Sequence, residues 1–393
     1  MTGIALLAGT RVLDFGAAPL AYAGRIFVEL GAEVVLVEPP GGLALRAAPP
    51  LVPTGDGATV SATFCAYAVG KRSVTIDEST PEGRALRDRL VTTADVALVP
   101  TDPAEARRRG LDEPSLRALH DGLVVVSATP FGLTGPRRNW KGSDTTAWAA
   151  SGLTYQLGDP DRPPVVAPLG LADAVTSLNA AMGAMLALRA RARSAHHRGQ
   201  LVDVSAQEAA LSVMMEAGPQ HAIEGQVPER VPRARMAGIG LYETADGAVD
   251  VTAFLPPQWD ALAAWIAEEL GIDEATLDVF RGPITARVPF NDVINGWINE
   301  LASRYDKQAF FLEAQRRGLP AGAVNEVGDL LHDHHLRAIG AWHSEDDDDE
   351  PRAGGVACRL PVGPLVVDGA RAVGGPIPEP GAHDDEVLGP LRG

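Results

Sequence analysis

Hydrophobic positions near the start of the chain fall into short runs separated by turn-forming residues. Residues 11–15 form one apolar run, 21–30 follow a helical pattern that Gly31 closes, and 33–38 are almost continuously apolar. Glycine just past a helix is a common C-terminal signal, and strands of a parallel sheet are apolar because both faces are covered. The pattern therefore predicts a βαβ unit of the doubly wound type.

The alternation of strand-like and helix-like segments continues to residue 217. We predict further strands at 70–77, 95–99, 123–127 and 201–205, and helices at 80–93 and 206–217. This alternation predicts an α/β fold with a Rossmann-like large domain. The two further glycines of the dinucleotide-binding fingerprint do not follow Gly16 at the required spacing, which argues against a nicotinamide-dependent enzyme.

Residues 172–193 predict a long helix, since they are mostly Ala, Leu, Met and Arg without proline. Its large apolar residues recur at intervals of three and four residues, so we expect them on one buried face. These residues are Leu178, Met182, Met185 and Leu186. Asp173 falls in the first turn, where free N–H groups and the helix dipole favour an anion. By itself this pattern is typical of a structural N-cap or first-turn aspartate, and a catalytic carboxylate is the alternative.

A second domain is expected after residues 218–235, which are rich in Pro, Gly and charge and predict a linker. Two short strands, 240–244 and 248–253, predict a hairpin that turns at Asp246-Gly247. Helices are predicted at 257–270, 290–303 and 307–318, with Trp259, Trp265 and Trp297 in the core. We therefore predict a large α/β domain over 1–217 and a smaller α+β domain over 236–328.

Composition and charge narrow the class of protein. A chain of 393 residues is too long for one core, and 46% hydrophobic with 22% charged residues is typical of a soluble globular protein. The net charge of −17 argues against nucleic acid or an anionic membrane as the main partner. Cys65 and Cys358 form neither a disulfide framework nor a metal-binding spacing. The N-terminus does not resemble a signal peptide and no uncharged apolar run approaches membrane-spanning length, so we expect a cytoplasmic protein.

Basic residues cluster three times at or beyond a predicted strand end, at Lys71-Arg72, at 107–109 and at 137–141. Ligands of open α/β sheets bind at the carboxyl ends of the strands. The recurrence favours an anion site, such as one for phosphates, and solvated surface charge is the alternative for each cluster. A metal site is not expected, because 332–335 and the acidic run 345–350 lack ligand spacing.

Short motifs in a fixed order run along nearly the whole chain. They include 13–14, 23–25, 30–34, 37–42, 70–77, 79–84, 94–96, 132–136, 151–153, 158–160, 199–203, 208–209, 317–322 and 380–388. Together they resemble the class III CoA-transferases, a group with formyl-CoA and carnitine CoA-transferases whose fold α-methylacyl-CoA racemases share. The resemblance implies an interlocked homodimer, and a C-terminal segment, 329–393, that returns to the large domain.

The resemblance identifies Asp173 with the family's nucleophile. It implies attack on an acyl-CoA thioester, an acyl–aspartyl anhydride, and transfer of CoA to a free carboxylic acid through an aspartyl-CoA intermediate. It implies no permanently bound cofactor and no metal, with coenzyme A entering as the acyl-CoA substrate. Further residues carried over to the CoA and substrate site are Lys71 and Arg72 near the adenine and phosphate end, Arg108 at a phosphate, Lys141 by the CoA or acyl group, and Ser143 and Asp144.

Departures from the family pattern bear on the substrate and the reaction. The loop 16–22 is one residue short, and 99–101 replaces a Glu-Asn-Phe that commonly contacts CoA. Ser143 and Leu255 stand where racemases carry a histidine and a glutamate, so the acid and base needed on opposite faces of the α-carbon are missing. We therefore predict a CoA-transferase. The alternatives are an acyl-CoA isomerase on the same fold and an inactive acyl-CoA-binding protein, and the sequence does not identify the acyl and acceptor substrates.

Overall fold

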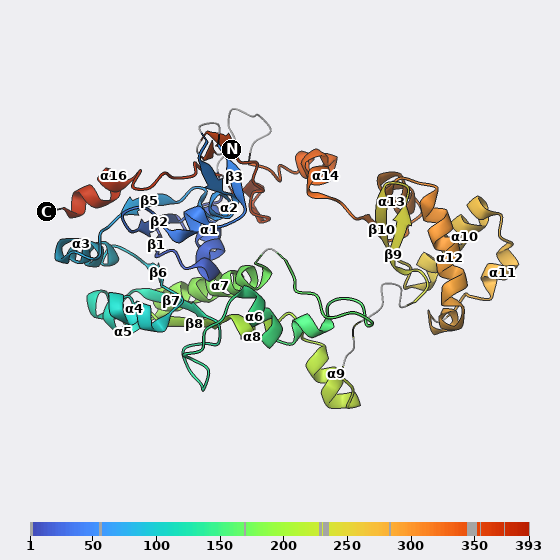
Figure 1. Ribbon diagram of the computed structural model, residues 1–393, viewed down its shortest axis with the longest axis horizontal. Coiled ribbons are helices and arrows are strands. Elements are labelled where there is room, and N and C mark those ends of the chain that lie inside the picture. Colours follow the sequence, from blue (N-terminus) through green and yellow to red (C-terminus); the bar gives the residue numbers. More distant parts are fainter. Residues whose placement is uncertain are drawn as a thin grey trace. The chain divides into compact units, whose positions relative to one another are not determined.

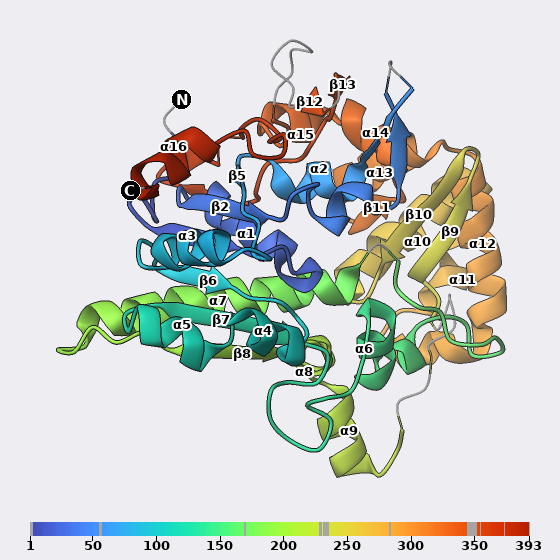
Figure 2. The same cartoon turned by 60° about the vertical axis from the view of Figure 1, so that its left-hand side comes forward.

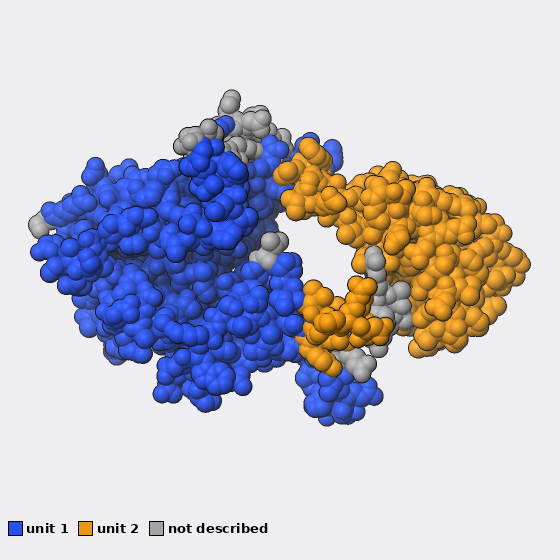
Figure 3. All heavy atoms as spheres, viewed as in Figure 1, with its two compact units in different colours: residues 1–154, 166–227, 334–393 blue, residues 155–165, 228–333 orange. Residues whose placement is uncertain are grey.

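The computed structural model describes residues 3–54, 57–168, 170–227, 230, 236–282, 284–343, 352–353, 355–372 and 374–392. The chain divides into two compact units, which Figure 3 shows in different colours. Unit 1 comprises Met1–Thr154, Val166–Val227 and His334–Gly393, and unit 2 comprises Tyr155–Val165 and Pro228–Asp333.

Unit 1 is built on a six-stranded sheet in the order β5-β2-β1-β6-β7-β8, and every neighbouring pair of strands is parallel. In chain order this is 3-2-1-4-5-6, the doubly wound arrangement, so the predicted fold class is confirmed. The strands are β1 Arg11–Asp14, β2 Glu33–Glu38, β5 Arg72–Thr75, β6 Val96–Leu98, β7 Val124–Thr129 and β8 Leu201–Ser205 (Figure 1).

Helices cover both faces of this sheet, because alternate strand residues point to opposite sides. Val12 of β1 packs with α1 (Ala21–Glu29), α7 (Leu171–Arg193) and α8 (Ala206–Leu211). Its neighbour Leu13 packs in the opposite cluster, with α3 (Pro81–Val91), α5 (Glu113–Leu119) and α16 (Asp384–Leu388).

Other helical segments of unit 1 are η1 Ala18–Leu20, η2 Ala44–Ala47, α2 Ala62–Ala68, α4 Pro103–Arg109, α6 Asp144–Ala150, η3 Leu153–Gln156 (whose last two residues belong to unit 2), α9 Ala217–Glu224, α15 His334–Ala338 and η5 Gly389–Leu391. Three small hairpins pair β3 Leu51–Pro53 with β4 Thr59–Ser61, β12 Arg352–Ala353 with β13 Val356–Ala357, and β14 Val366–Val367 with β15 Ala370–Arg371.

The buried face of α7 differs from the sequence prediction. This long helix runs along the sheet (Figure 2) and buries small residues: Ala172, Thr176, Ser177, Ala180, Ala181, Ala184 and Ala187. Leu178, Met182 and Leu186 are instead 51–60% exposed, and Met185 is half-buried. Small side chains let α7 approach the sheet closely; a Cβ on Gly183 would lie 2.7 Å from Cγ1 of Val202 in β8. The prediction of a buried Leu/Met face was therefore wrong.

Among the described residues, α7 is also the one helix whose length and composition would allow it to cross a membrane. It packs on α1, α8, β7 and β8. A helix that contributes seven buried residues to the core of a domain meets the same test of length and composition. We interpret α7 as the central core helix of unit 1.

Unit 2 consists of a three-stranded antiparallel sheet, β11-β10-β9, and helices around one core. The predicted hairpin is present as β9 Ile239–Thr244 and β10 Gly247–Thr252, and β11 is Ala321–Ala323. The predicted helices are present as α10 Pro256–Leu270, α12 Asn291–Ser303 and α13 Lys307–Arg316, accompanied by α11 Glu274–Asp278, η4 Ile284–Phe290 and α14 Val327–His332. Trp259 and Trp265 are almost completely buried in this core, and Trp297 packs partly buried against the same core, as predicted.

Several segment boundaries differ from the predicted ones. Residues 217–224, mostly inside the expected linker, form α9, and unit 2 also takes in 155–165. Unit 1 resumes at His334 rather than at 329. Residues 231–235 and the acidic run 345–350 lie outside the described residues.

Candidate active site

Asp173 is the third residue of α7, and the residue that caps this helix is Gly170. Gly170 has φ +66°, a left-handed conformation that glycine adopts without strain. Asp173 is therefore not the N-cap, which removes the simplest structural role considered for it. Its carboxylate remains in the first turn, where the helix dipole favours a negative charge.

A second carboxylate meets the start of α7. The backbone N–H of Asp173 donates a hydrogen bond of 2.9 Å to Oδ1 of Asp144, which begins α6. Ser143 caps α6: its Oγ accepts from the N–H of Thr146, and the Thr146 hydroxyl oxygen accepts from the N–H of Ser143 at 2.7 Å. This capping box fixes the start of α6 and thereby places Asp144 against Asp173. Ser143 itself thus has a structural role in this geometry.

The ionisation of Asp173 is shifted by its surroundings. Burial, and secondly the negative charge of Asp144, raise the pKa of Asp173 from 3.8 to about 6. Both effects disfavour the charged form, since burial removes water and a neighbouring carboxylate repels. Perturbed carboxyl groups in a cavity are characteristic of functional sites.

Asp173 lines a cavity of about 470 Å³, which we call the Asp173 cavity. Tyr22 from α1 and Tyr67 from α2 line it too, with ring centroids 5.8 Å apart. Burial, and then the charge of Asp173, raise the pKa of Tyr67, so its phenol stays protonated and can donate. The remaining lining is small and mostly apolar: Ala18, Leu45, Pro49, Pro50, Ala62, Thr63, Ala66, Gly170, Ala174 and Ser177.

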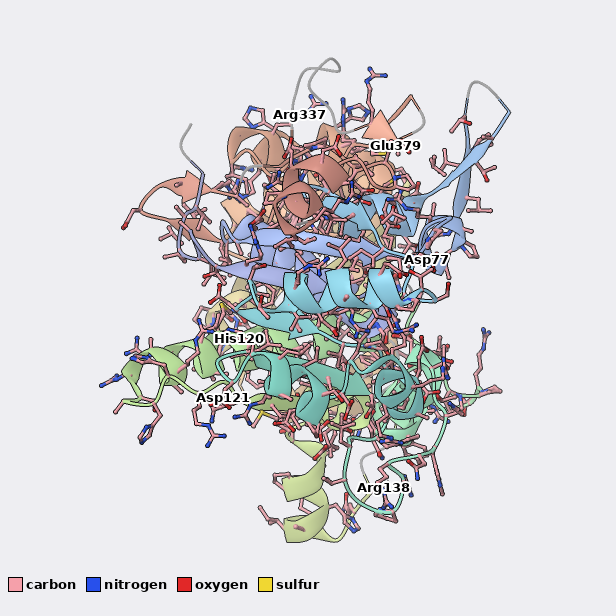
Figure 4. All side chains as sticks on the ribbon, turned by 90° about the vertical axis from the view of Figure 1, so that its left-hand side faces the viewer. Asp77, His120, Asp121, Arg138, Arg337 and Glu379 are labelled. Atoms are coloured by element: carbon pink, nitrogen blue, oxygen red, sulfur yellow. The ribbon has the colours of Figure 1, made fainter. Side chains whose placement is uncertain are left out.

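A larger cavity of about 800 Å³ adjoins it and shares Ala18 and Leu45 with it. We call it the switch-point cavity, because Phe15 follows β1 and Pro100 follows β6, the two strands between which the sheet order reverses. Ligands of doubly wound folds bind at this crevice. Asp77, labelled in Figure 4, lines it just beyond β5.

A third cavity, of about 390 Å³, shares Thr101 and Asp102 with the switch-point cavity. We call it the Lys141 cavity, since Lys141 lines it with Arg107 and Arg138. Nζ of Lys141 pairs with Oδ2 of Asp102 at 2.5 Å while the side chain stays 82% exposed. Lys141, a predicted site residue, therefore lines a cavity that shares residues with the switch-point cavity, which in turn shares residues with the Asp173 cavity.

The structure places Lys71 and Arg72 elsewhere. Nζ of Lys71 pairs with Oδ2 of Asp14 at 2.7 Å and donates to the carbonyl of Ala21 at 3.0 Å, and the side chain is 2% exposed. Arg72 pairs with Glu33 at 2.7 Å and with Glu386. Both cations thus bond to protein groups, Lys71 inside the core and Arg72 between β2 and α16. They do not line the three cavities.

The three consecutive arginines of α4 have different surroundings in the structure. Arg108, the expected phosphate contact, is exposed and does not line these cavities, whereas its neighbour Arg107 does. Arg109 makes two hydrogen bonds of 2.9 Å to the Glu78 carboxylate. Arg107 and Arg138 belong to the predicted basic clusters at 107–109 and 137–141, but only Arg108 and Lys141 of these clusters were carried over to the site, and sequence reasoning missed Tyr22 and Tyr67. For Arg107 the available signal was the 100° turn between successive helix residues, which points adjacent arginines in different directions.

Comparison with known proteins identifies the family of this chain. The family model for CoA-transferase family III matches residues 7–384. The chain belongs to CoA-transferase family III.

Several curated relatives of this family III chain cover almost its whole length. The succinyl-CoA–D-citramalate CoA-transferase of Chloroflexus aurantiacus is 30% identical over 98% of this chain and 93% of its own. The succinate–glutarate CoA-transferase of Agrobacterium fabrum is 31% identical over 98% and 96%. A crystal structure of a CaiB/BaiF family protein from Brucella suis superposes with a TM-score of 0.86 at 26% identity, covering 99% of this chain and 100% of that one. The homologues support CoA-transferase activity and CoA thioesters as substrates.

Proposed function

We propose that this family III chain moves CoA from an acyl-CoA donor to a free carboxylic acid, with Asp173 as the nucleophile. The observation that carries the proposal is the position of Asp173 on the wall of a cavity of about 470 Å³ that adjoins the crevice at the switch point of the sheet. A carboxylate there can meet a thioester whose CoA portion lies along the strand ends. The match to the family over residues 7–384 supports the same reaction.

The chemistry consists of four balanced acyl transfers. The Asp173 carboxylate attacks the thioester carbonyl, the C–S bond breaks, and an acyl–aspartyl anhydride and CoA thiolate form. The thiolate then attacks the aspartyl carbonyl of the anhydride, which releases the donor acid and leaves aspartyl-CoA. The acceptor carboxylate attacks aspartyl-CoA to give a second anhydride and CoA thiolate. Attack of this thiolate on the acceptor's carbonyl forms the new acyl-CoA and restores Asp173.

The residues around Asp173 supply what this sequence of steps needs. A carboxylate is a weak nucleophile, so alignment within a closed site has to provide much of the acceleration; proximity can contribute about 7–11 kcal/mol. Asp144 holds the backbone of Asp173 through the 2.9 Å hydrogen bond. The protonated phenols of Tyr22 and Tyr67 are the available donors to a carbonyl oxygen that gains charge in the cavity. Thioesters and anhydrides are already activated, so the scheme uses neither ATP nor a permanently bound cofactor.

We also propose that two copies of the chain assemble. The exposed face of α7 presents Leu178, Met182 and Leu186 in one stripe. Contiguous apolar surface of this kind marks an interaction site. A second copy covering this stripe accords with the interlocked homodimer that the resemblance implies, and we propose the cytoplasm, where acyl-CoA substrates are formed, as its location.

The function is tested by following the CoA moiety. The enzyme is incubated with an acyl-CoA labelled in its CoA and with an unlabelled acid, using succinyl-, acetyl- and formyl-CoA as donors, and mass spectrometry records the products. Transfer of label to the new acid supports the proposal. Exchange of deuterium at the α-carbon without movement of CoA would show an isomerase instead, and binding of acyl-CoA without either reaction would show an inactive binding protein.

The intermediate gives an independent test. With acyl-CoA present, hydroxylamine should convert Asp173 to its hydroxamate, detected as a mass shift of the peptide that contains Asp173. The same peptide from enzyme treated without acyl-CoA serves as the control. A modified peptide that does not contain Asp173 would refute its role as nucleophile.

A further inference from the structure

The wall of the Asp173 cavity consists mostly of carbon. Besides the Asp173 carboxylate, its polar side-chain groups are four hydroxyls, those of Tyr22, Thr63, Tyr67 and Ser177. The hydroxyl of Thr63 donates to the carbonyl of Pro49 at 3.2 Å, and that of Ser177 donates to the carbonyl of Pro19 at 2.7 Å. The two phenols form no hydrogen bond with the part of the chain that the structure describes. An acyl group in this cavity therefore meets apolar side chains and two phenols.

Positive charge close to the cavity is bonded to other protein groups. No lysine, arginine or histidine is among the described residues that line the cavity. Arg46 follows the lining residue Leu45, but its guanidinium makes two hydrogen bonds, of 2.6 and 2.7 Å, to the carboxylate of Glu38. Arg25 on α1 is buried and pairs with Glu29 at 2.8 Å. Both arginines are therefore neutralised by carboxylates of the protein itself.

Negative charge, in contrast, is already concentrated at the start of α7. The carboxylate of Asp173 lines the cavity, and that of Asp144 accepts from the backbone amide of Asp173. Burial and the charge of Asp144 raise the pKa of Asp173 to about 6, so this position disfavours even one ionised carboxyl group. A further carboxylate on the substrate would be repelled and would lose its water without gaining a cation, which is strongly unfavourable.

We infer that the acids served by this chain are monocarboxylic, with an uncharged and mainly apolar chain that lies in the Asp173 cavity. The reacting carboxyl group meets Asp173 and the phenols, and the rest of the acid packs against carbon. The inference rests on the proposed function, because it takes the cavity at Asp173 as the acyl site. It separates this chain from the two relatives above whose names include succinyl-CoA or succinate, a dicarboxylic acid.

The test compares three CoA esters of similar size, pentanoyl-, 4-oxopentanoyl- and succinyl-CoA. Each ester is incubated with the enzyme and with its own acid labelled with carbon-13, and mass spectrometry records label that enters the ester. This exchange requires no second substrate. We expect kcat/KM for pentanoyl- and 4-oxopentanoyl-CoA to exceed that for succinyl-CoA about a hundredfold or more. 4-Oxopentanoyl-CoA carries an acetyl group in place of the free carboxylate, so it separates charge from size.

A substitution in the cavity wall tests the same idea by gain of function. Leu45→Lys adds a cation to the wall, and we expect it to raise the exchange of succinyl-CoA about tenfold, through a hydrogen bond to a charged group. Leu45→Met is the matched control, because it gives a long side chain without charge and should keep the preference for pentanoyl-CoA. The Tm of both variants shows whether the fold is retained.

The wild-type exchange decides the inference even if a variant does not fold. Exchange of succinyl-CoA as fast as that of pentanoyl-CoA would overturn it, and so would transfer to other acids without exchange of pentanoyl-CoA. Rejection of 4-oxopentanoyl-CoA together with succinyl-CoA would also overturn it, as would an unchanged preference in Leu45→Lys with the wild-type Tm, because charge would not be the cause. In all these cases CoA still moves and the proposed function stands; if no acid in any assay receives CoA, the proposed function itself fails.

Discussion

The backbone amide of Asp173 donates to the carboxylate of Asp144 across 2.9 Å, so that two acidic side chains from separate helices meet at the start of α7. The pairing has two consequences that act together. Asp144 anchors the backbone of the proposed nucleophile, and the negative charge of Asp144 helps burial to raise the pKa of the Asp173 carboxyl to about 6. Positioning and ionisation of Asp173 therefore depend on the same neighbour.

Replacing Asp173 by Asn should abolish CoA transfer, because an amide cannot form the anhydride. Asn preserves the shape of the side chain, so the fold should persist. Asp292→Asn is a suitable control, since Asp292 is an exposed aspartate in the first turn of another helix, α12, and transfer by this variant should match the wild type. Wild-type transfer by Asp173→Asn, measured with labelled CoA, would contradict the mechanism.

The same substitution should stabilise the chain at neutral and alkaline pH. The pKa of Asp173 is raised from 3.8 to about 6, so ionised Asp173 opposes folding above pH 6, and this penalty disappears as the pH falls towards 3.8. We therefore expect Asp173→Asn to raise Tm at pH 8 and to match the wild type near pH 4, by differential scanning fluorimetry. A lower Tm at pH 8 would instead indicate a structural role for the carboxylate.

The pH profile of transfer should show the ionisation of Asp173 directly. Because the nucleophile must be deprotonated, kcat/KM should fall about tenfold per pH unit below pH 6. Asp144→Asn keeps an oxygen that can accept from the Asp173 amide but removes the negative charge, so the acid limb should move to lower pH. An unchanged limb in this variant would exclude Asp144 as a cause of the shift.

Lys71 should prove to be a structural residue. Its ammonium and the Asp14 carboxylate form a buried pair, and removing one partner of such a pair typically costs about 3–5 kcal/mol. Lys71→Met should therefore lower the free energy of unfolding by about that amount in urea titrations, whereas the double variant Asp14→Leu/Lys71→Met should recover part of it. Full stability of Lys71→Met combined with a raised KM for acyl-CoA would restore the CoA-contact role.

The apolar stripe on α7 should be covered by a second copy. Light scattering should report a dimer even after dilution to nanomolar concentration, because threaded chains cannot separate without unfolding. Leu178→Glu/Met182→Glu should lower Tm and reduce the dimer fraction, whereas Leu119→Glu, at an isolated exposed leucine of α5, should change neither. An active monomer, or a double variant that remains fully dimeric, would refute this interface.

Much of unit 1 could be predicted because its signals are local. Apolar runs predicted β1, β2 and β8 almost to the residue, and proline, glycine and helix-forming residues predicted α1, α3 and the full length of α7. Ordered motifs over nearly the whole chain identified the family, and the position of Asp173 among them made it the candidate nucleophile. Segments without such periodicity were missed, namely α2, α4, α5 and α6, each of which has seven residues and completes less than two turns.

The sequence by itself determined the class of fold, the order of the central elements, the family and the first-turn position of Asp173, because each of these follows from neighbouring residues or from motifs in order. Only the tertiary structure decided which face of α7 is buried, since periodicity groups residues on a face without saying what covers it. Burial of Lys71 by Asp14, 57 residues away, and the contact of Asp144 with Asp173 across 29 residues likewise arise from packing between distant elements. Arg107 rather than Arg108 lines a cavity because of the rotation of α4 against the sheet. Two adjacent arginines give no sequence signal for that rotation.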